Sequence, residues 1–375
     1  MQSNRRQVLQ WLGATGFALP WASRASGGRI VLGQSAAMSG PSAQLGIQMA
    51  LGAKACFDAF NAAGGINGTT IELRTLDDGY DPERCKANTA KFIADDVFAL
   101  FGYVGTPTTV AALPLIKDSR KPFLGPFTGA MSLREPRLKN VFHVRASYDQ
   151  ETEEIIKQLT NLGLKRIAVF MQNDAYGEAG LSGVTKALQA RGLAPVGIGR
   201  VERNSLDVAA AVKDVLASKP DAVVQVSVYK ACAEFIRAAR KGGYGGVFFN
   251  ISFVGTQALA DELGSEGAGV RVTQVMPYPY APILPIVKEY QDALRKYAGD
   301  AKPNYSSMEG YIAARVLIEG LKLAKPLSPE GLIAGLESLN NISVGGFAVG
   351  FSSSNHVASK FVELSMLSGD GRVRR

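Results

Sequence analysis

The segment that most constrains the fold is a short apolar run that ends in glycine and leads directly into a helix. Residues 97–105 read Val-Phe-Ala-Leu-Phe-Gly-Tyr-Val-Gly, and Thr106 and Pro107 follow them. A nearly continuous apolar run of this length predicts a strand that is buried on both faces of a parallel sheet. Threonine suits the N-cap of a helix and proline its first position, so we expect a helix to begin at Thr106.

This turn is a candidate anion site, because free backbone N–H groups, the helix dipole and threonine hydroxyls all favour a negative charge there. Residues 123–130 (Phe-Leu-Gly-Pro-Phe-Thr-Gly-Ala) repeat the design of strand, glycine, hydroxyl and glycine. Either turn alone is equally well explained as an ordinary connection between a strand and a helix. Two such turns at the carboxyl edge of one sheet predict a cradle for a carboxylate.

Strand-like and helix-like segments alternate along most of the chain, which predicts an α/β fold with parallel sheets and right-handed crossovers. Two breaks interrupt the rhythm, at residues 145–148 and at residues 277–285, where four prolines exclude a helix or a central strand. Beyond the two turns above, we expect strands at 29–37, 70–76, 141–144, 166–171, 193–202, 222–228, 247–249, 270–275 and 361–367, and helices at 44–63, 82–92, 148–164, 177–191, 206–218, 232–241, 256–263, 286–297, 306–323 and 329–339.

Length and charge narrow the class of protein. A chain of 375 residues with 46% apolar and 20% charged residues predicts a globular protein with a large core and two domains. The formal charge of +8 includes Arg5, Arg6 and Arg24, which lie in a segment that we expect to be removed. Without these three of the 41 basic residues, 38 remain against 33 acidic ones, a balance of +5. The basic residues are scattered, which argues against a nucleic-acid partner.

Residues 1–25 are predicted to be an export signal. Arg5 and Arg6 precede a moderately apolar run, and small residues follow where a signal peptidase requires them. The segment resembles a twin-arginine signal, which exports folded proteins; a chance basic start on a cytosolic protein is the alternative. No cysteine lies near the cleavage site and no later apolar run reaches membrane length, so we expect neither a lipid anchor nor membrane insertion.

Cysteine and histidine chemistry is not expected in this chain. Cys56, Cys85 and Cys232 show no disulfide framework spacing and each falls in a predicted helix, so we expect three free, buried thiols. His143 and His356 are far apart in sequence and no ligand spacing surrounds either, so we expect no metal and no cofactor. No Ser/His/acid set and no G-x-S-x-G motif is present, which argues against an α/β enzyme.

Several motifs occur in an order that resembles the type I periplasmic binding proteins, and most of all the leucine/isoleucine/valine-binding group that serves ABC importers. The motifs are Ser-Ala-Ala-Met-Ser-Gly-Pro at 35–41, Ala-Ala-Gly-Gly-Ile-Asn-Gly at 62–68, Leu-Asp-Asp-Gly-Tyr-Asp-Pro at 76–82 and Asn-Asp-Ala-Tyr-Gly-Glu at 173–178. Each motif is weak alone, but the ordered set covers essentially the whole chain after the export signal.

The resemblance implies two doubly wound α/β lobes that are joined by three crossing segments and close on a ligand between them. Lobe 1 is then expected to cover residues 28–145 and 277–352, and lobe 2 residues 146–276 and 353–375. These boundaries agree with the two breaks in the alternation. Both lobes are expected to present the carboxyl ends of their strands to the cleft.

The resemblance also implies a set of ligand-binding residues. The ligand carboxylate falls to Thr106 and to the turn of Phe127, Thr128 and Gly129. Two aromatic residues of lobe 2 fall on Tyr176 and Tyr229, and the tryptophan that covers the ligand side chain in amino-acid binders corresponds to Leu45. Residue by residue, packing is the alternative role for the tyrosines and helix capping for the threonines.

The sequence departs from the family pattern at two places. The acid that pairs with the ligand ammonium falls at about Phe253, although this loop alignment can slip by a residue or two; Asp149, Asp174 and Glu178 are the other acids that could serve. An ammonium that is buried without a partner costs several kcal/mol, so the departure puts amino-acid binding in doubt. The family's disulfide is absent, because its two positions hold Tyr80 and Gly105.

The resulting prediction is a monomeric, non-enzymatic receptor in the periplasm that delivers a small carboxylate to the permease of an ABC importer in the inner membrane. The carboxylate is either an amino acid, branched-chain or other, or an aromatic or aliphatic carboxylic acid. A ligand sensor that docks a receptor or regulator is the alternative, and an α/β enzyme that uses the same cleft is a third hypothesis.

Export by the twin-arginine route yields a direct prediction. Replacing both Arg5 and Arg6 with lysine is expected to abolish secretion, because the apolar run behind them is too weak to direct the chain to another route. Cell fractionation measures the periplasmic yield of the variant against the parent chain. An unchanged yield would show that export does not depend on the arginine pair.

Overall fold

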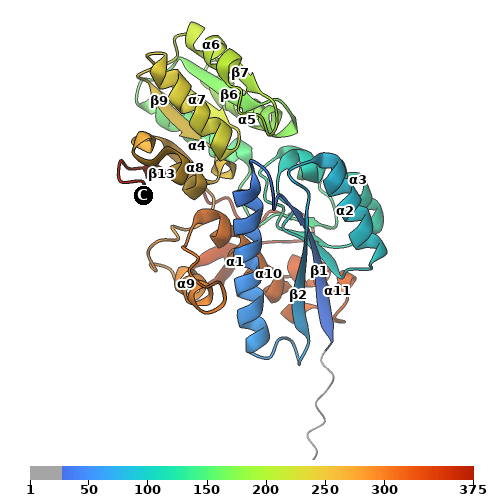
Figure 1. The fold of residues 1–375 in the computed structure, drawn as a ribbon. Helices are drawn as coiled ribbons and strands as arrows, with labels where there is room; N and C mark the ends of the chain where they lie inside the picture. Colours follow the sequence, from blue (N-terminus) through green and yellow to red (C-terminus); the bar gives the residue numbers. More distant parts are fainter. Residues whose placement is uncertain (1–27) are drawn as a thin grey trace, which may run out of the picture.

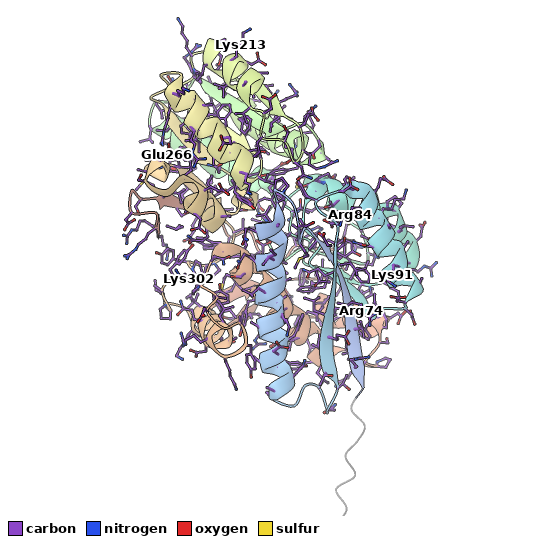
Figure 2. The ribbon with its side chains drawn as sticks, in the orientation of Figure 1. Arg74, Arg84, Lys91, Lys213, Glu266 and Lys302 are labelled. Carbon is purple, nitrogen blue, oxygen red and sulfur yellow. The ribbon has the colours of Figure 1, made fainter. Side chains whose placement is uncertain are left out.

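The computed structural model describes residues 28–375 and shows two α/β lobes stacked end to end, with the C-terminus in the upper lobe (Figure 1). The export signal predicted at residues 1–25 lies outside the described residues. Charged side chains such as Arg74, Lys91 and Lys213 are spread over both lobes rather than gathered in one place (Figure 2).

Lobe 1 contains a five-stranded parallel sheet in the order β2-β1-β3-β4-β5. β3 (Ala99–Phe101) is the central strand and is buried along its length, as the apolar run at 97–105 predicts. The other strands are β1 (Arg29–Ala36), β2 (Thr70–Asp77), β4 (Phe123–Leu124) and β5 (Val141–Phe142), and the helices are α1 (Ala43–Ala62), α2 (Pro82–Ala94), α3 (Thr106–Ser119), α9 (Pro285–Tyr297), α10 (Tyr305–Leu323) and α11 (Pro329–Glu337), with the short turn η1 (Met131–Leu133).

Lobe 2 contains a seven-stranded sheet in the order β14-β13-β10-β9-β8-β6-β7, in which only the two C-terminal strands at the edge run antiparallel. Its strands are β6 (Ile167–Gln172), β7 (Ile198–Val201), β8 (Ala222–Val226), β9 (Val247–Asn250), β10 (Arg271–Gln274), β13 (Glu363–Leu367) and β14 (Val373–Arg374), and its helices are α4 (Tyr148–Asn161), α5 (Ala175–Gln189), α6 (Ala209–Ala217), α7 (Tyr229–Lys241) and α8 (Thr256–Leu263), with the turns η2 (Ser252–Val254) and η3 (Gly264–Gly267).

The chain passes between the lobes three times, after β5, after β10 and before β13. At the third passage the chain still pairs with lobe 1 beyond residue 352. His143 N donates to His356 O and Ala358 N donates to His143 O, each at 2.8 Å. We therefore propose to end lobe 1 after residue 358, with the third crossing over residues 359–362.

Three local expectations differ from the structure. The hairpin of β11 (Ile342–Val344) and β12 (Phe347–Val349) in lobe 1 is absent from the prediction. The strand expected at 193–202 is confined to β7, because residues 193–197 form an irregular approach to it. The N-cap of α3 is Gly105 rather than Thr106, since the chain turns there at a φ of 101°, which favours glycine.

The three cysteines are free and buried, in α1, α2 and α7. Within residues 28–375, no helix is long and apolar enough to cross a membrane. Over the same residues, no group of three or more histidine, cysteine, aspartate or glutamate side chains is placed to hold a metal ion.

A buried network of charges joins the two lobes at the first crossing. Arg145 is fully buried and donates to Glu151 of lobe 2 at 2.8 Å, to the Ser252 hydroxyl, and to Glu309 of lobe 1 at 3.5 Å. Glu151 also accepts from Ser252 N at 2.7 Å and from the Thr273 hydroxyl at 2.6 Å. Burial opposes the charge on Arg145, but Glu309 and Glu151 more than offset it and raise the pKa of the guanidinium.

Glu309 is the weakly satisfied member of this network, and we expect it to make stability depend on pH. Burial raises the pKa of Glu309 from 4.5 to about 7, and attraction to Arg145 offsets only part of the shift. Because the folded state retains this proton to a higher pH than the unfolded chain, the free energy of unfolding should fall as pH rises from about 4.5 to about 7. A shift of this size corresponds to a loss on the order of 3 kcal/mol.

The Glu309→Gln variant cannot titrate, so its free energy of unfolding should fall less than that of the parent chain across this window. Denaturant unfolding at several pH values between 4 and 8 measures the difference, with both states monitored by circular dichroism. Glu319→Gln on the same helix is the control, because the pKa of Glu319 is lowered and its removal leaves the decline intact. Parallel curves for Glu309→Gln and the parent chain would contradict the assignment.

Candidate ligand-binding site

The carboxyl ends of the central strands of both lobes face one another, and the lobes are in contact there. Leu45 of α1 lies so close to Gly255 of lobe 2 that a Cβ on this glycine would approach Leu45 Cδ2 to 2.6 Å. Gln172 Nε2, at the end of β6, donates to the Tyr80 hydroxyl of lobe 1 at 3.3 Å. Asn204 Nδ2 of lobe 2 donates to Gly79 O at 3.2 Å. The structure is therefore the closed form of a two-lobed molecule.

A cluster of hydroxyls lies at the two turns that the sequence predicts as a carboxylate cradle. Thr106 Oγ1 and Thr128 Oγ1 are 2.7 Å apart and both residues are fully buried. The Tyr148 hydroxyl is buried beside them and has no hydrogen-bond partner. Burial raises the pKa of Tyr148, whereas Arg145 and the two threonine hydroxyls act to lower it. Three hydroxyls thus converge from two lobes, and we name them the hydroxyl cluster (Thr106, Thr128, Tyr148).

Gly129 allows the third hydroxyl to reach this cluster. A Cβ on Gly129 would lie 2.5 Å from Tyr148 Cδ1, so no larger residue fits between the turn and the tyrosine ring. Tyr148 N donates to Gly129 O at 2.8 Å, which fixes the start of α4 against the turn. The helix begins here because Ser147 caps it, with its hydroxyl accepting from Gln150 N at 3.2 Å.

The other threonines of α3 do not take part in the cluster. The Thr108 hydroxyl donates to Val104 O at 2.6 Å, and the Thr109 hydroxyl donates to Gly105 O at 2.6 Å. These bonds satisfy backbone carbonyls of the preceding turn. Of the threonines near the start of α3, Thr106 is therefore the one whose hydroxyl is directed toward the second turn.

Aromatic rings fill the space beside the hydroxyl cluster. Phe253, in η2 of lobe 2, lies among them: its ring centroid is 4.9 Å from that of Tyr176, 5.2 Å from Phe127 and 6.2 Å from Tyr80. The Tyr176 and Tyr148 rings are 5.5 Å apart. All five side chains are buried. We name this set the aromatic cluster (Tyr80, Phe127, Tyr148, Tyr176, Phe253).

Tyr176 is held in place by its own helix start and by the neighbouring strand. Asp174 caps α5 and accepts from Tyr176 N at 2.9 Å. The Tyr176 hydroxyl donates to Ser227 O, after β8, at 3.4 Å. Tyr229 is also buried, and burial raises the pKa of its hydroxyl while the backbone of Gln44 on α1 acts to lower it. Tyr229 thus faces the first turn of α1 in lobe 1.

Comparison with known proteins decides the family. The model of a family described as periplasmic binding protein matches residues 29–371. The chain belongs to this family of periplasmic binding proteins.

Individual relatives agree with this assignment. A solved structure described as a possible leucine/isoleucine/valine-binding protein from Rhodopirellula baltica is 35% identical, with a TM-score of 0.90, and the match covers 94% of this chain and 97% of the other. A substrate-binding periplasmic protein from Ralstonia solanacearum is 32% identical, with a TM-score of 0.87 and coverage of 92% and 99%. The Leu/Ile/Val-binding protein homolog 7 of Brucella suis is 24% identical over 342 residues, which cover 86% of this chain and 84% of that protein.

The family assignment confirms the predicted fold class of two parallel-sheet lobes, and the protein is a binding protein rather than an enzyme. The two histidines have structural positions that agree with this. His143 Nε2 lies 3.0 Å from Leu133 O, and the His356 ring stacks on Phe142 with centroids 3.9 Å apart. Both histidines are buried in lobe 1.

The three acids considered as ammonium partners are engaged elsewhere. Asp149 pairs with Lys186 at 2.9 Å, and the Glu178 side chain is 58% exposed, with Arg200 at 3.7 Å. Asp174 lies nearest the aromatic cluster, because its charge helps to raise the pKa of Tyr80, but it already pairs with Arg203 at 3.4 Å.

Three residues of the site are absent from the predicted set. Tyr80 and Tyr148 belong to the aromatic cluster, and Arg145 lies 5.5 Å from the Phe127 ring centroid and 5.7 Å from that of Tyr148. The positions of Tyr80 and Gly105, which the resemblance assigns to a disulfide, are adjacent here: a Cβ on Gly105 would lie 2.3 Å from Tyr80 Cε2. The break at 145–148 was the one sequence signal that pointed to Arg145 and Tyr148.

The unpartnered hydroxyl of Tyr148 gives a prediction that separates binding from stability. Tyr148→Phe removes a buried hydroxyl that has no protein partner, so the free energy of unfolding should stay the same or rise slightly. The affinity for a carboxylate ligand should fall by about tenfold or more, because a hydrogen bond to a charged group is lost. Denaturant unfolding and calorimetry measure the two quantities on the same protein.

Tyr103→Phe is the matched control. The Tyr103 hydroxyl is buried in the core of lobe 1 and accepts from Thr89 Oγ1 at 3.0 Å. Its loss should lower stability without changing affinity. If Tyr148→Phe behaves like this control, the Tyr148 hydroxyl has no role in the site.

Proposed function

We propose that the protein is the substrate-binding component of an ABC importer and captures a small carboxylic acid with an apolar or aromatic body between its lobes. The position of Phe253 within the aromatic cluster carries this proposal. The family comparison supports a periplasmic binding protein, and we propose that the chain reaches the periplasm by the twin-arginine route. A branched-chain amino acid is the second candidate ligand, because the Leu/Ile/Val-binding relatives are named for such ligands.

The hydroxyl cluster supports a carboxylate at the lobe 1 side of the ligand. Thr106 and Thr128 have hydroxyls that can turn to donate, and Tyr148 has a buried donor without a partner. Hydrogen bonds from neutral donors to a carboxylate are charge-assisted and strong in a site without water. No additional cation is required, because backbone N–H groups at the start of α3 add to the same positive field.

The aromatic cluster supports an apolar body without an ammonium. The ring of Phe253 packs edge-on against Phe127 and Tyr176, so the position that the resemblance assigns to an acid offers hydrocarbon surface. An ammonium placed there would lose its hydration without gaining a carboxylate, at a cost of several kcal/mol. An aromatic or branched aliphatic body would gain edge-on ring contacts and apolar burial instead.

Closure of the lobes provides the capture step. In the closed form the hydroxyl and aromatic clusters are buried, so a ligand enters when the lobes turn apart about the three crossing segments. Contacts such as Leu45 against Gly255 and Gln172 with Tyr80 must break on opening and re-form on closing. The closed form is then the state that a permease recognises, since the loaded and empty proteins differ in shape.

A matched pair of ligands tests the ligand class by calorimetry. Phenylpyruvate and the 2-oxo acid of leucine should bind more tightly than phenylalanine and leucine, because they lack the ammonium and keep the carboxylate and the apolar body. A thermal-shift screen over both classes first identifies which body size fits, since a ligand that binds only the native state raises its melting temperature. Amino acids that bind tenfold more tightly than their oxo acids would refute the proposed class and leave the importer role intact.

The Phe253→Glu variant tests the position directly. A carboxylate at this site should shift the preference toward the amino acid of each pair by about tenfold or more, since a hydrogen bond between charged groups contributes roughly 1.5–3 kcal/mol. Phe253→Leu is the control, because it shortens the side chain without adding charge. If both variants keep the same preference, residue 253 does not face the ligand.

A further inference from the structure

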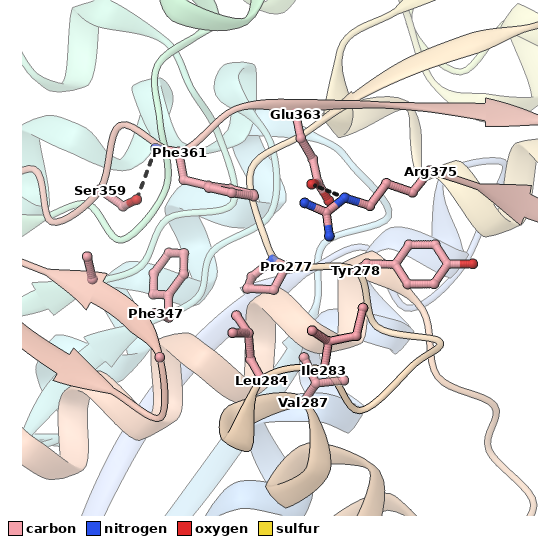
Figure 3. A pocket seen from close by; sticks show the side chains of 12 residues that line it. Pro277, Tyr278, Ile283, Leu284, Val287, Phe347, Ser359, Phe361, Glu363 and Arg375 are labelled. Carbon is pink, nitrogen blue, oxygen red and sulfur yellow. Dashed lines mark hydrogen bonds and ion pairs between the residues drawn. The ribbon is translucent and has the colours of Figure 1, made fainter.

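A second cavity lies away from the cleft, at the second and third crossings, and is shown in Figure 3. Its volume is about 370 Å³, and none of its lining residues belongs to the hydroxyl or aromatic cluster. Both lobes contribute to its wall, through α9 and the β11–β12 hairpin on one side and β13 on the other. We name it the hinge pocket; its apolar wall is formed by Pro277, Tyr278, Leu284, Val287, Phe347 and Phe361.

The size and lining of the hinge pocket fit a small molecule. Small-molecule sites typically occupy about 300–1,000 Å³ and combine an apolar wall with a few polar groups. One water occupies about 30 Å³ of liquid, so the pocket is much larger than a site for one or two bridging waters. The apolar side chains around it surround an open space instead of packing against one another (Figure 3).

One carboxylate forms the polar end of the pocket. Glu363 Oε2 pairs with Arg375 Nε at 3.0 Å, whereas Glu363 Oε1 is buried and has no hydrogen-bond partner. The Glu363 side chain is 13% exposed and that of Arg375 is 58% exposed, so the guanidinium is solvated while the carboxylate is not. Burial raises the pKa of Glu363, and Arg375 offsets part of this. A donor that reaches Oε1 would remove this penalty.

We propose that the hinge pocket is a second ligand site, which takes a compact apolar amine whose ammonium donates to Glu363 Oε1. A carboxylic acid is disfavoured, because it would bring a second negative charge against Glu363 inside an apolar wall. A neutral apolar molecule fills the wall but leaves the carboxylate unpaired. The proposal concerns residues outside the cleft, and it does not depend on the function proposed above.

Three probes of one shape test the chemistry. Cyclohexylamine, cyclohexanol and cyclohexanecarboxylate share a ring and differ in charge, and each is titrated into the full chain without its export signal by ligand-observed NMR. Cyclohexylamine should bind at least about tenfold more tightly than cyclohexanol, the gain expected from a charge-assisted hydrogen bond. Equal binding of the amine and the alcohol would overturn the role of Glu363.

Two variants locate the site. Glu363→Gln keeps the shape and removes the charge, so it should weaken cyclohexylamine by about tenfold and leave cyclohexanol unchanged. Ala348→Phe, on the rim of the pocket, should weaken all binding by filling the space. Glu289→Gln is the control, because Glu289 is also paired with an arginine, Arg315 at 3.5 Å, on the same lobe outside the pocket.

Circular dichroism and thermal unfolding establish that each variant is folded before it is titrated. Cyclohexylamine binding that survives both Glu363→Gln and Ala348→Phe would place the amine elsewhere and overturn the proposal. Because the cleft ligand is proposed to be an acid and the probe is an amine, either result leaves the assignment of the cleft unaffected.

Discussion

The buried guanidinium of Arg145 is the constraint on which the arrangement of the two lobes depends. A charge in the interior is tolerated only when it is paired and hydrogen-bonded, and removal of one partner of a buried pair typically costs about 3–5 kcal/mol. Arg145 lies on the first crossing, and its partners come from both lobes: Glu151 and Ser252 from lobe 2, and Glu309 from lobe 1. The network therefore defines how the two sheets face each other in the closed form. A lobe movement that separates Glu309 from Arg145 leaves one buried charge less well compensated.

The same network explains why neutral groups form the anion site. Arg145 is next to the rings of Phe127 and Tyr148, but its charge is already balanced by two carboxylates. Arg134 is equally occupied, because it donates to the carbonyls of Arg145 and Ala146 at 3.2 Å. Both guanidinium groups thus shape the turn that precedes α4, and hydroxyl and backbone donors are left to bind a ligand carboxylate. A site built this way selects by hydrogen-bond geometry more than by net charge.

The sequence was informative where local rules decide the structure and uninformative where distant segments meet. The central strand β3 follows from its apolar run and its terminal glycines, and the alternation of elements predicts both parallel sheets. The β11–β12 hairpin was predictable, since two alternating runs flank Gly345 and Gly346, and this signal was overlooked. The roles of Tyr148 and Arg145 could not be predicted, because each depends on contacts between elements that only the tertiary fold brings together. Lobe 1 pairing beyond residue 352 was missed for the same reason.

Tyr80 shows how one missing covalent bond can alter a binding site. The resemblance assigns its position and that of Gly105 to a disulfide, and here the Tyr80 ring lies against Gly105 in the space that only a glycine leaves open. A ring reaches farther than a cysteine side chain, so Tyr80 joins the aromatic cluster beside Phe253 and accepts from Gln172 of the other lobe. The replacement therefore adds apolar surface and a contact between lobes at the same point where Phe253 replaces an acid. Two departures from the family pattern thus act in one direction, toward a ligand with a larger apolar body and no ammonium.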